Sequence, residues 1–258
     1  MNPLTTGLSA KEILGVPVYA LTQDEVLNKI NETISRRGHL HIGVVNAAKM
    51  VNMRRNEALK KDVLSSDLIL ADGMAVVWAS RLLGCALPER VTGIDLMMGM
   101  LRQGNEHGYR IFCLGATDEV LEKVVTRITD EYPHVKLVGK HSGYFKEEEE
   151  PTIVAEIVEM KPDILLVAMT SPKKENFLAR WSDQLGVPIC HGVGGSFDVL
   201  AGKVQRAPET WQRLGLEWLY RVTQEPTRLW KRYLVTNTLF CLMVFRQFFK
   251  SMLDQRRK

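Results

Sequence analysis

The sequence predicts an α/β protein built around a doubly wound, mostly parallel β-sheet. Three observations support this fold class: apolar runs of strand length recur along the chain, segments with helical periodicity separate them, and the runs are apolar throughout rather than alternating. Strands that are apolar on both faces are typical of a parallel sheet covered by helices on both sides. With 258 residues, 45% hydrophobic and 25% charged, the chain has an ordinary globular composition.

The predicted elements of the first half alternate between these two patterns. Residues 22–37 are expected to form a helix, because Thr22 and Glu25 have the spacing of a capping box. Gly104 is expected to end a later helix. In order, the sequence then predicts a strand at 39–46, a helix from 47, a strand at 64–71, a helix at 73–83 and a helix at 95–104.

The second half continues this alternation up to a glycine-rich turn. Thr117 is placed to cap one helix, acidic residues in the first turn favour another, and Pro172 suits the first turn of a third. Together the elements predict a Rossmann-like fold. The remaining segments are a strand at 109–115, a helix at 117–132, a short strand at 136–139, a helix at 148–160, a strand at 163–169, a helix at 172–185 and a strand at 188–193.

Several classes of function lack their sequence signature. No G-x-G-x-x-G motif follows a strand and no Walker A motif is present, so neither nicotinamide nor ATP chemistry is supported. The histidines and the four cysteines do not have the spacing of metal ligands. We therefore expect no metal site and no cofactor.

The positive charge of the chain is concentrated near its C-terminal end. Residues 203–258 contain 12 Lys and Arg against 4 Asp and Glu, whereas the rest of the chain has more acidic than basic residues. Three of the five tryptophans lie in the same segment. A basic segment with interleaved aromatic residues suits an anionic membrane surface or a nucleic acid.

This basic segment is predicted to form two helices, at 209–222 and 227–249, with Pro226 breaking or kinking the path between them. Its apolar run at 234–245 is about half as long as the roughly 20 residues that a membrane-spanning helix needs. We therefore predict a Rossmann-like domain at residues 1–206 and a helical, membrane-binding appendage at residues 207–258. No signal peptide is visible, which favours a cytoplasmic protein.

Asp72 follows a predicted buried strand and precedes a helix. It could be a helix N-cap, or a general base at the sheet edge where α/β proteins bind ligands. The cluster Arg90-Val-Thr92-Gly93-Ile-Asp95 favours the second interpretation, because an arginine beside a helix N-terminus suits a diphosphate. The alternatives are that Arg90 is a surface charge and that Thr92 is only a cap.

Other predicted strand ends also carry candidate binding residues. Asn46 could cap a helix or bind a sugar hydroxyl. In the segment Ser171-Pro-Lys-Lys174-Glu175, two lysines oppose the helix dipole, which suggests that an anion offsets them. The glycine-rich turn lets a backbone approach a ligand closely, and an exposed tyrosine could stack on a nucleobase, although simple turns explain both. The candidate nucleotide-binding residues are Tyr144, Gly194, Gly195 and Asp198.

Positive residues of the C-terminal segment share one face if the helix is continuous. These residues are Arg221, Arg228, Lys231 and Arg232. A solvated face is the usual interpretation of such a pattern. The tryptophans and leucines in the same helices favour a binding surface instead.

Taken together, these motifs resemble the WecG/TagA/CpsF glycosyltransferases, which are bacterial enzymes of polysaccharide and wall teichoic acid assembly. The similarity covers residues 15–233, which is nearly the whole chain. It rests on five segments: Ala71-Asp-Gly73, Arg90-Val-Thr-Gly-Ile-Asp95, Ser171-Pro-Lys-Lys-Glu175, Gly192-Val-Gly-Gly-Ser-Phe-Asp-Val-Leu-Ala-Gly-Lys203, and the stretch from Arg206 to Pro226.

The resemblance implies an inverting, metal-independent transfer of a sugar from a UDP-sugar donor to a polyprenyl-diphosphate-linked sugar. The sugar would be of the N-acetylmannosamine type or a hexose such as glucose. The enzyme would lie peripherally on the inner face of the cell membrane, and family members can self-associate into homo-oligomers. The implied roles are a base for Asp72, diphosphate binding for Arg90, pocket lining for Asn46, contact with the nucleotide for Tyr144 and Asp198, and closure over the site for Arg221, Arg228 and Lys231.

Three residues depart from the family pattern. Val44 stands where threonine is common, and Lys174 stands where glutamine is usual. Both lie near the expected pocket, so they leave the identity of the donor and acceptor sugars open. Lys231 replaces an arginine and keeps its charge without its bidentate geometry.

Two other classes of protein are alternatives to a transferase. One alternative is a non-catalytic nucleotide- or nucleic-acid-binding protein that uses the basic C-terminal segment. The long apolar stretches of that segment argue against it, so we expect no nucleic-acid partner. A UDP-sugar epimerase is disfavoured, because its NAD-binding motif is missing.

Overall fold

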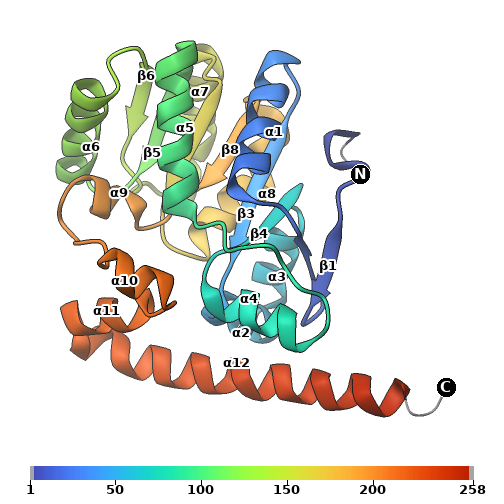
Figure 1. Ribbon diagram of the computed structural model, residues 1–258. Coiled ribbons are helices and arrows are strands. Elements are labelled where there is room, and N and C mark those ends of the chain that lie inside the picture. Colours follow the sequence, from blue (N-terminus) through green and yellow to red (C-terminus); the bar gives the residue numbers. More distant parts are fainter. Residues whose placement is uncertain (1–2, 256–258) are drawn as a thin grey trace.

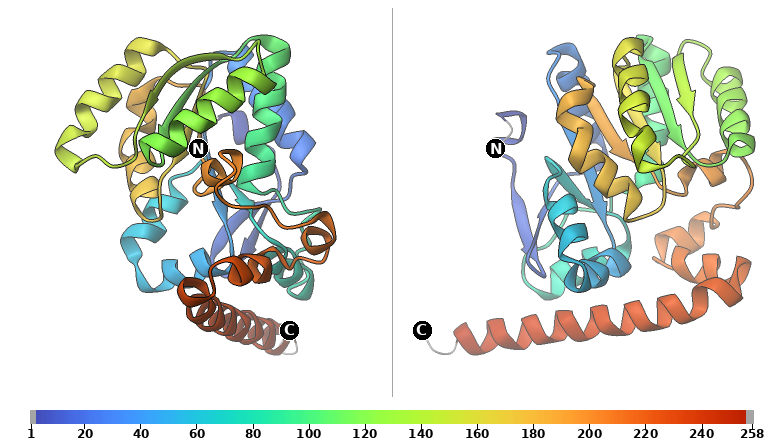
Figure 2. Two further views of the ribbon diagram at one scale, coloured as in Figure 1. Left: turned by 90° about the vertical axis from the view of Figure 1, so that its left-hand side faces the viewer. Right: turned by 180° about the vertical axis from the view of Figure 1, so that it is seen from behind.

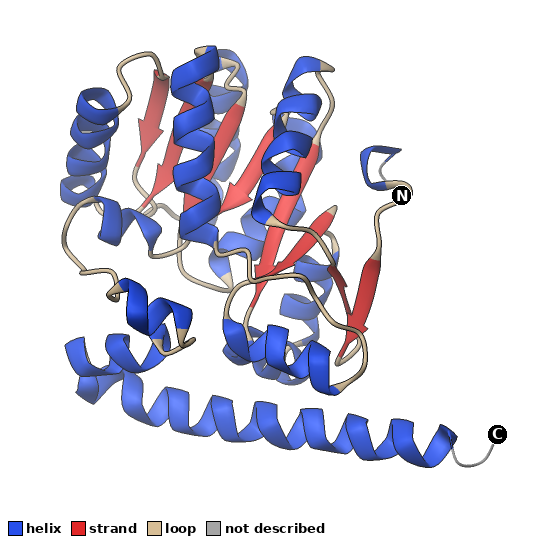
Figure 3. Ribbon diagram, viewed as in Figure 1, coloured by secondary structure: helices blue, strands red, loops and turns tan. Residues whose placement is uncertain are grey.

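The structure is a computed structural model that describes residues 3–255. Its core is a six-stranded sheet in the order β4-β3-β8-β7-β5-β6, and every neighbouring pair is parallel (Figures 1 and 3). This confirms the predicted α/β class with a parallel sheet. The strands are β3 (Leu40–Val45), β4 (Leu68–Ala71), β5 (Arg110–Gly115), β6 (Lys136–His141), β7 (Ile164–Ala168) and β8 (Ile189–Gly192).

Helices cover both faces of this sheet, as a doubly wound fold requires (Figure 2). Side chains of β5 alternate between the two faces: Ile111 packs with α1, α5 and α6, whereas Phe112 packs with α7 and α8. Both faces are therefore buried, which explains why the strands are apolar throughout. The helices are α1 (Gln23–Ser35), α2 (Ala47–Arg55), α3 (Glu57–Leu64), α4 (Met74–Leu82), α5 (Gly93–His107), α6 (Asp118–Glu131), α7 (Glu150–Met160), α8 (Lys173–Leu185) and α9 (Ser196–Leu200).

Two predicted boundaries are wrong near the start of the sheet. The strand expected at 64–71 begins only at Leu68, because Leu64 is the last residue of α3 and a short turn follows it. Asn56 has an extended backbone that ends α2, and its side chain accepts a hydrogen bond from the N–H of Leu59. One asparagine therefore ends one helix and caps the next, so the single helix predicted from 47 is two helices.

A glycine was also misassigned as a helix end. Helix α5 continues through Gly104 to His107 and ends at Gly108, which has a left-handed backbone. Gly104 instead lets a neighbouring segment approach, since an added Cβ would lie 3.2 Å from Val135. The sequence also gave no sign of the antiparallel hairpin formed by β1 (Ala10–Ile13) and β2 (Val16–Tyr19).

The C-terminal segment forms three helices rather than the predicted two. They are α10 (Glu209–Arg213), α11 (Glu217–Gln224) and α12 (Pro226–Gln255). Gly215 separates α10 from α11 with a left-handed backbone, and it packs so tightly that an added Cβ would lie 2.6 Å from the Cβ of Met74. Pro226 is the first residue of α12, where its missing N–H is harmless, so it starts the helix rather than kinking it.

Helix α12 lies along one end of the protein and packs against α2 (Figures 1 and 2). Phe240 and Val244 of α12 are buried in the same apolar cluster as Met50 of α2. The side chain of Gln247 also accepts a hydrogen bond of 3.1 Å from the backbone N–H of Leu14 in the hairpin. Within residues 3–255, no helix has both the length and the apolar content needed to cross a membrane.

Candidate active site

The carboxyl ends of the parallel strands place Asn46 and Asp72 side by side. Val45 and Ala71 are register partners, so the residues that follow them leave the sheet at adjacent positions. The amide Nδ2 of Asn46 lies 3.4 Å from Oδ2 of Asp72 as its hydrogen-bond donor. Asn46 Oδ1 caps α2 by accepting the N–H of Lys49 at 3.0 Å. The oxygen of the Asn46 amide therefore caps α2, while its nitrogen donates to the Asp72 carboxylate.

Asp72 is half-buried and does not cap a helix. The N-cap of α4 is Gly73, and no side chain caps that helix end. Gly73 has a φ of 125°, a conformation that residues with a side chain rarely adopt. The capping interpretation of Asp72 is therefore wrong, and its carboxylate faces the strand ends beside Asn46.

The next loop brings Arg90, Thr92 and Asp95 to the same edge of the sheet. The N–H of Val91 donates to the carbonyl of Ala71 at 2.9 Å, which fixes this loop beside the end of β4. Thr92 is buried and caps α5 by accepting the N–H of Asp95 at 3.1 Å. The Thr92 hydroxyl donates to the Asp95 carboxylate at 2.7 Å. Thr92 is thus a helix cap that also orients Asp95.

Two ion pairs join this loop to the C-terminal segment. The Arg90 guanidinium pairs through Nη1 with Glu217 at the start of α11. Asp95 pairs with Arg206, which lies ahead of α10. All four side chains are partly buried. Sequence reasoning did not identify Arg206 or Glu217, because each meets its partner across more than 100 residues of chain.

The first turn of α8 carries three charged residues with different environments. Lys173 Nζ donates to the carbonyls of Gly143 and Phe145 at 2.9 and 2.7 Å, so it holds the loop that bears Tyr144. Lys174 is buried, and its Nζ lies 3.5 Å from Glu175. Internal carbonyls are thus the partners of Lys173, and the Glu175 carboxylate is a partner of Lys174. The anion that the helix dipole suggested stays a prediction.

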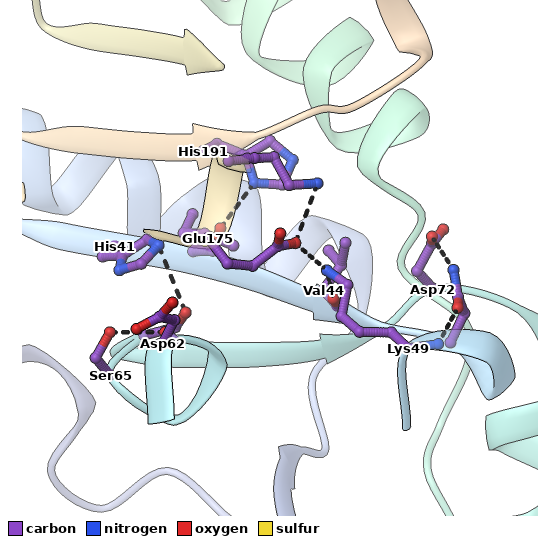
Figure 4. A network of polar contacts seen from close by, with 12 residues as sticks. His41, Val44, Lys49, Asp62, Ser65, Asp72, Glu175 and His191 are labelled. Atoms are coloured by element: carbon purple, nitrogen blue, oxygen red, sulfur yellow. Dashed lines mark hydrogen bonds and ion pairs between the residues drawn. The ribbon is translucent and has the colours of Figure 1, made fainter. Parts of the chain in front are cut away.

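Glu175 also pairs with Lys49, which sequence reasoning did not single out. Oε1 of Glu175 lies 2.7 Å from Nζ of Lys49, and both side chains are about nine-tenths buried (Figure 4). Burial by itself would raise the pKa of Glu175, but the Lys49 and Lys174 ammonium groups outweigh it and lower this pKa to about 2. Burial, together with the Lys49 charge, lowers the pKa of Lys174 to about 8.

Two buried histidines lie next to this charged cluster (Figure 4). Burial lowers the pKa of His41 to about 3 and that of His191 to about 4. Because both pKa values lie well below physiological pH, both rings are neutral. His191 Nδ1 lies 3.1 Å from the carbonyl oxygen of Ile42. A small pocket beside the histidines is lined by charged and by apolar side chains, among them Lys49, Glu175 and Leu178.

The candidate nucleotide-binding residues lie along the same edge of the sheet at two different strands. Tyr144 follows β6 and is 80% exposed. Gly194 and Gly195 follow β8, and Asp198 in α9 lies 3.6 Å from Lys203. Strands are spaced by about 4.8 Å, so the sheet order puts roughly 24 Å between the ends of β4 and β6. Asp72 and Tyr144 are thus at opposite ends of the edge.

The predicted C-terminal cations are not brought to Asp72 or Arg90 by any contact in the described part of the chain. Arg221 and Lys231 are exposed on α11 and α12. The side chain of Arg228 lies outside the described residues. Among residues 3–255, no group of three His, Cys, Asp or Glu side chains is placed to hold a metal ion.

Comparison with known proteins gives a match over most of the chain. Residues 11–253 match the Glycosyl transferase WecG/TagA/CpsF family. An N-acetylglucosaminyldiphosphoundecaprenol N-acetyl-beta-D-mannosaminyltransferase from Bacillus subtilis is 41% identical over 175 residues, which are 67% of this chain and 67% of that protein. The protein of the same name from Bacillus spizizenii is 35% identical over 170 residues, which are 66% of this chain and 65% of that protein.

Proposed function

This chain belongs to the WecG/TagA/CpsF family of glycosyl transferases, and from that premise we propose that it transfers a sugar from a UDP-sugar to a polyprenyl-diphosphate-linked sugar. Two relatives are named for transfer of N-acetylmannosamine to N-acetylglucosaminyldiphosphoundecaprenol, which supports a lipid-linked acceptor here. The donor sugar is of that type or a hexose such as glucose. The observation that carries the proposal is the Asp72 carboxylate, which caps no helix, lies beside Asn46, and shares its sheet edge with the loop that bears Arg90.

The reaction is a single displacement at the anomeric carbon of the donor, which inverts its configuration. Asp72 accepts the proton of an acceptor hydroxyl as that oxygen forms its bond to the anomeric carbon. The bond from this carbon to the phosphate oxygen breaks, and its electron pair leaves with UDP. The nearby Asn46 amide keeps one oxygen of Asp72 in place.

Charge on the departing UDP is stabilised by cationic and N–H groups, and the proposal invokes no metal ion. Arg90 uses only Nη1 for Glu217 among the described contacts, so Nε and Nη2 can reach a diphosphate. The start of α5 adds backbone N–H groups and the positive end of a helix dipole. Lys174 adds a buried positive charge near the end of β8.

The C-terminal helices are proposed to close over the site. Gly215 packs on the first turn of α4, directly after Asp72 and Gly73. The Arg90–Glu217 and Asp95–Arg206 ion pairs join the same helices to the loop beside Asp72. These contacts support an appendage that docks on the rim and shields the reacting groups from water.

Helix α12 is proposed to bind an anionic membrane surface at the inner face of the cell membrane. A stripe of its exposed side chains is apolar, with spacings of eight, three, four and four residues that keep it on one face of the helix. Arg246 and Lys250 are exposed beside this stripe, where they can meet lipid phosphates. The stripe consists of Leu234, Leu242, Phe245, Phe249 and Leu253.

A Phe245→Asp variant should bind vesicles that contain anionic lipid on the order of tenfold more weakly than the wild type. Burying one aromatic side chain contributes about 1.5–3 kcal/mol, and the new carboxylate also repels the surface. Co-sedimentation with vesicles measures this. Val158→Asp is a matched control, because Val158 is similarly exposed on α7. Equal binding by both variants would contradict membrane docking through α12.

The proposed reaction is tested by UDP release from a panel of UDP-sugars. Release should occur with one donor, and only when a short-chain polyprenyl-diphosphate sugar is added as acceptor. This result would also identify the donor sugar. If no donor releases UDP with several acceptors and calorimetry still detects UDP binding, the chain is a binding protein rather than a transferase.

A further inference from the structure

A partly buried chain of polar contacts runs from the start of α8 to Asp72 (Figure 4). It begins at Glu175, whose carboxylate lies 2.7 Å from the Lys49 ammonium. The same ammonium donates to the carbonyl of Val44 at 2.7 Å. The Lys49 side chain therefore links α8 to the C-terminal end of strand β3, although the backbone of Lys49 belongs to α2.

From Lys49 the chain continues through Asn46. The Lys49 backbone N–H occupies Asn46 Oδ1, which leaves the amide Nδ2 to point toward Asp72. The contacts of this ammonium with Glu175 and Val44 add a side-chain link between the first turn of α2 and the end of β3, beside the Asn46 cap. The Asn46 amide is thereby linked to a carboxylate that does not itself touch Asp72.

Stability alone does not explain this arrangement. A buried ion pair loses much of its attraction to the cost of desolvation, and apolar residues of similar size are often as stable. Glu175 is also the carboxylate that both Lys49 and Lys174 face. Its removal would leave two buried ammonium groups near each other without this counterion. The pair is therefore best explained by what it holds in place.

We propose that Glu175 is a positioning residue for Asp72, acting through Lys49 and Asn46. The carboxylate fixes the Lys49 ammonium, Lys49 fixes the first turn of α2, and the Asn46 amide then holds Asp72 toward the acceptor hydroxyl. This inference rests on the proposed function, since it assigns a purpose to the orientation of the base.

The experiment compares Glu175→Gln, Lys49→Met and the double variant. Each single variant should lower kcat on the order of 10²-fold, because small misplacements of reacting groups have effects of that size. The Kd of UDP should stay within about twofold, since neither residue is assigned to the nucleotide. The double variant should be no slower than the slower single variant, because one interruption already breaks the chain of contacts.

Glu150→Gln is the matched control. Glu150 is also a buried carboxylate packed on α8, where it accepts hydrogen bonds from Trp181 Nε1 at 2.7 Å and Arg180 Nη1 at 3.1 Å. Its loss should lower the melting temperature without changing kcat. Lys49→Arg should restore part of the activity, because it keeps the charge that Glu175 binds.

Other outcomes would overturn the inference. Wild-type kcat in Glu175→Gln would do so, as would equal losses of kcat in Glu150→Gln. Fully additive losses in the double variant would mean that the two residues act independently. If Glu175→Gln does not fold, Lys49→Met and Lys49→Arg decide the question in the same way. Absence of UDP binding and of transfer in the wild type would instead refute the proposed function, and the positioning role with it.

Discussion

An Asp72→Asn variant should lose sugar transfer by a factor on the order of 10²–10⁴, which is the typical contribution of a general base. An amide cannot accept the hydroxyl proton, but its oxygen can still accept the hydrogen bond from Asn46. The fold should be unchanged, because Gly73 rather than Asp72 stands at the N-cap of α4. The measurements are acceptor-dependent UDP release, the Kd of UDP and the melting temperature.

The Asp72 result needs a control that removes a carboxylate elsewhere. Asp130 is exposed on α6, far along the chain from the strand ends that carry the site. Asp130→Asn should retain wild-type turnover and UDP affinity. Turnover of Asp72→Asn close to that of Asp130→Asn would show that Asp72 is not the base.

An Arg90→Ala variant should weaken transfer by a factor on the order of 10²–10³, as the loss of one charge-stabilising donor typically does. The variant should also bind UDP more weakly, because Nε and Nη2 would no longer reach the diphosphate. Arg90→Lys should recover only part of the loss, since an ammonium keeps the charge without the forked geometry. UDP release and calorimetry with UDP measure the two effects.

A Glu217→Gln variant separates the two roles of Arg90. It removes the negative charge of α11 that pairs with Arg90, and it leaves the Arg90 guanidinium in place. If Arg90 acts on the diphosphate, Glu217→Gln should retain much more activity and UDP affinity than Arg90→Ala. Equal losses in the two variants would mean that Arg90 acts mainly by docking the C-terminal helices.

The sequence predicted most of the core because its elements depend on local patterns. Apolar runs gave the strands of the parallel sheet, and Thr22 and Thr117 cap their helices as their spacing indicated. Two of the errors occurred at residues whose type can serve more than one purpose. Asn56 ends one helix and caps another, whereas Gly104 lies inside a helix to make room for Val135.

For the site as well, local patterns could be predicted from the sequence and long-range contacts could not. The sequence put Asn46 and Asp72 each at the end of a predicted strand. The structure then showed that these two strands are neighbours, so that the two residues leave the sheet side by side. The roles of these residues in catalysis stay predictions. The Lys49–Glu175 pair could not be found in this way, because its members are 126 residues apart and the motif that contains Glu175 does not indicate which cation it meets.

The sequence by itself determined the order of strands and helices, the edge of the sheet that carries polar side chains, and the amphipathic pattern of the C-terminal segment. These features follow from hydrogen bonding and apolar periodicity within short stretches of chain. Only the tertiary structure decided that Gly215 packs on α4, that Glu217 meets Arg90, and that Glu175 holds Lys49. Such pairings depend on how distant elements pack, and a charge in a sequence does not specify which opposite charge it will meet.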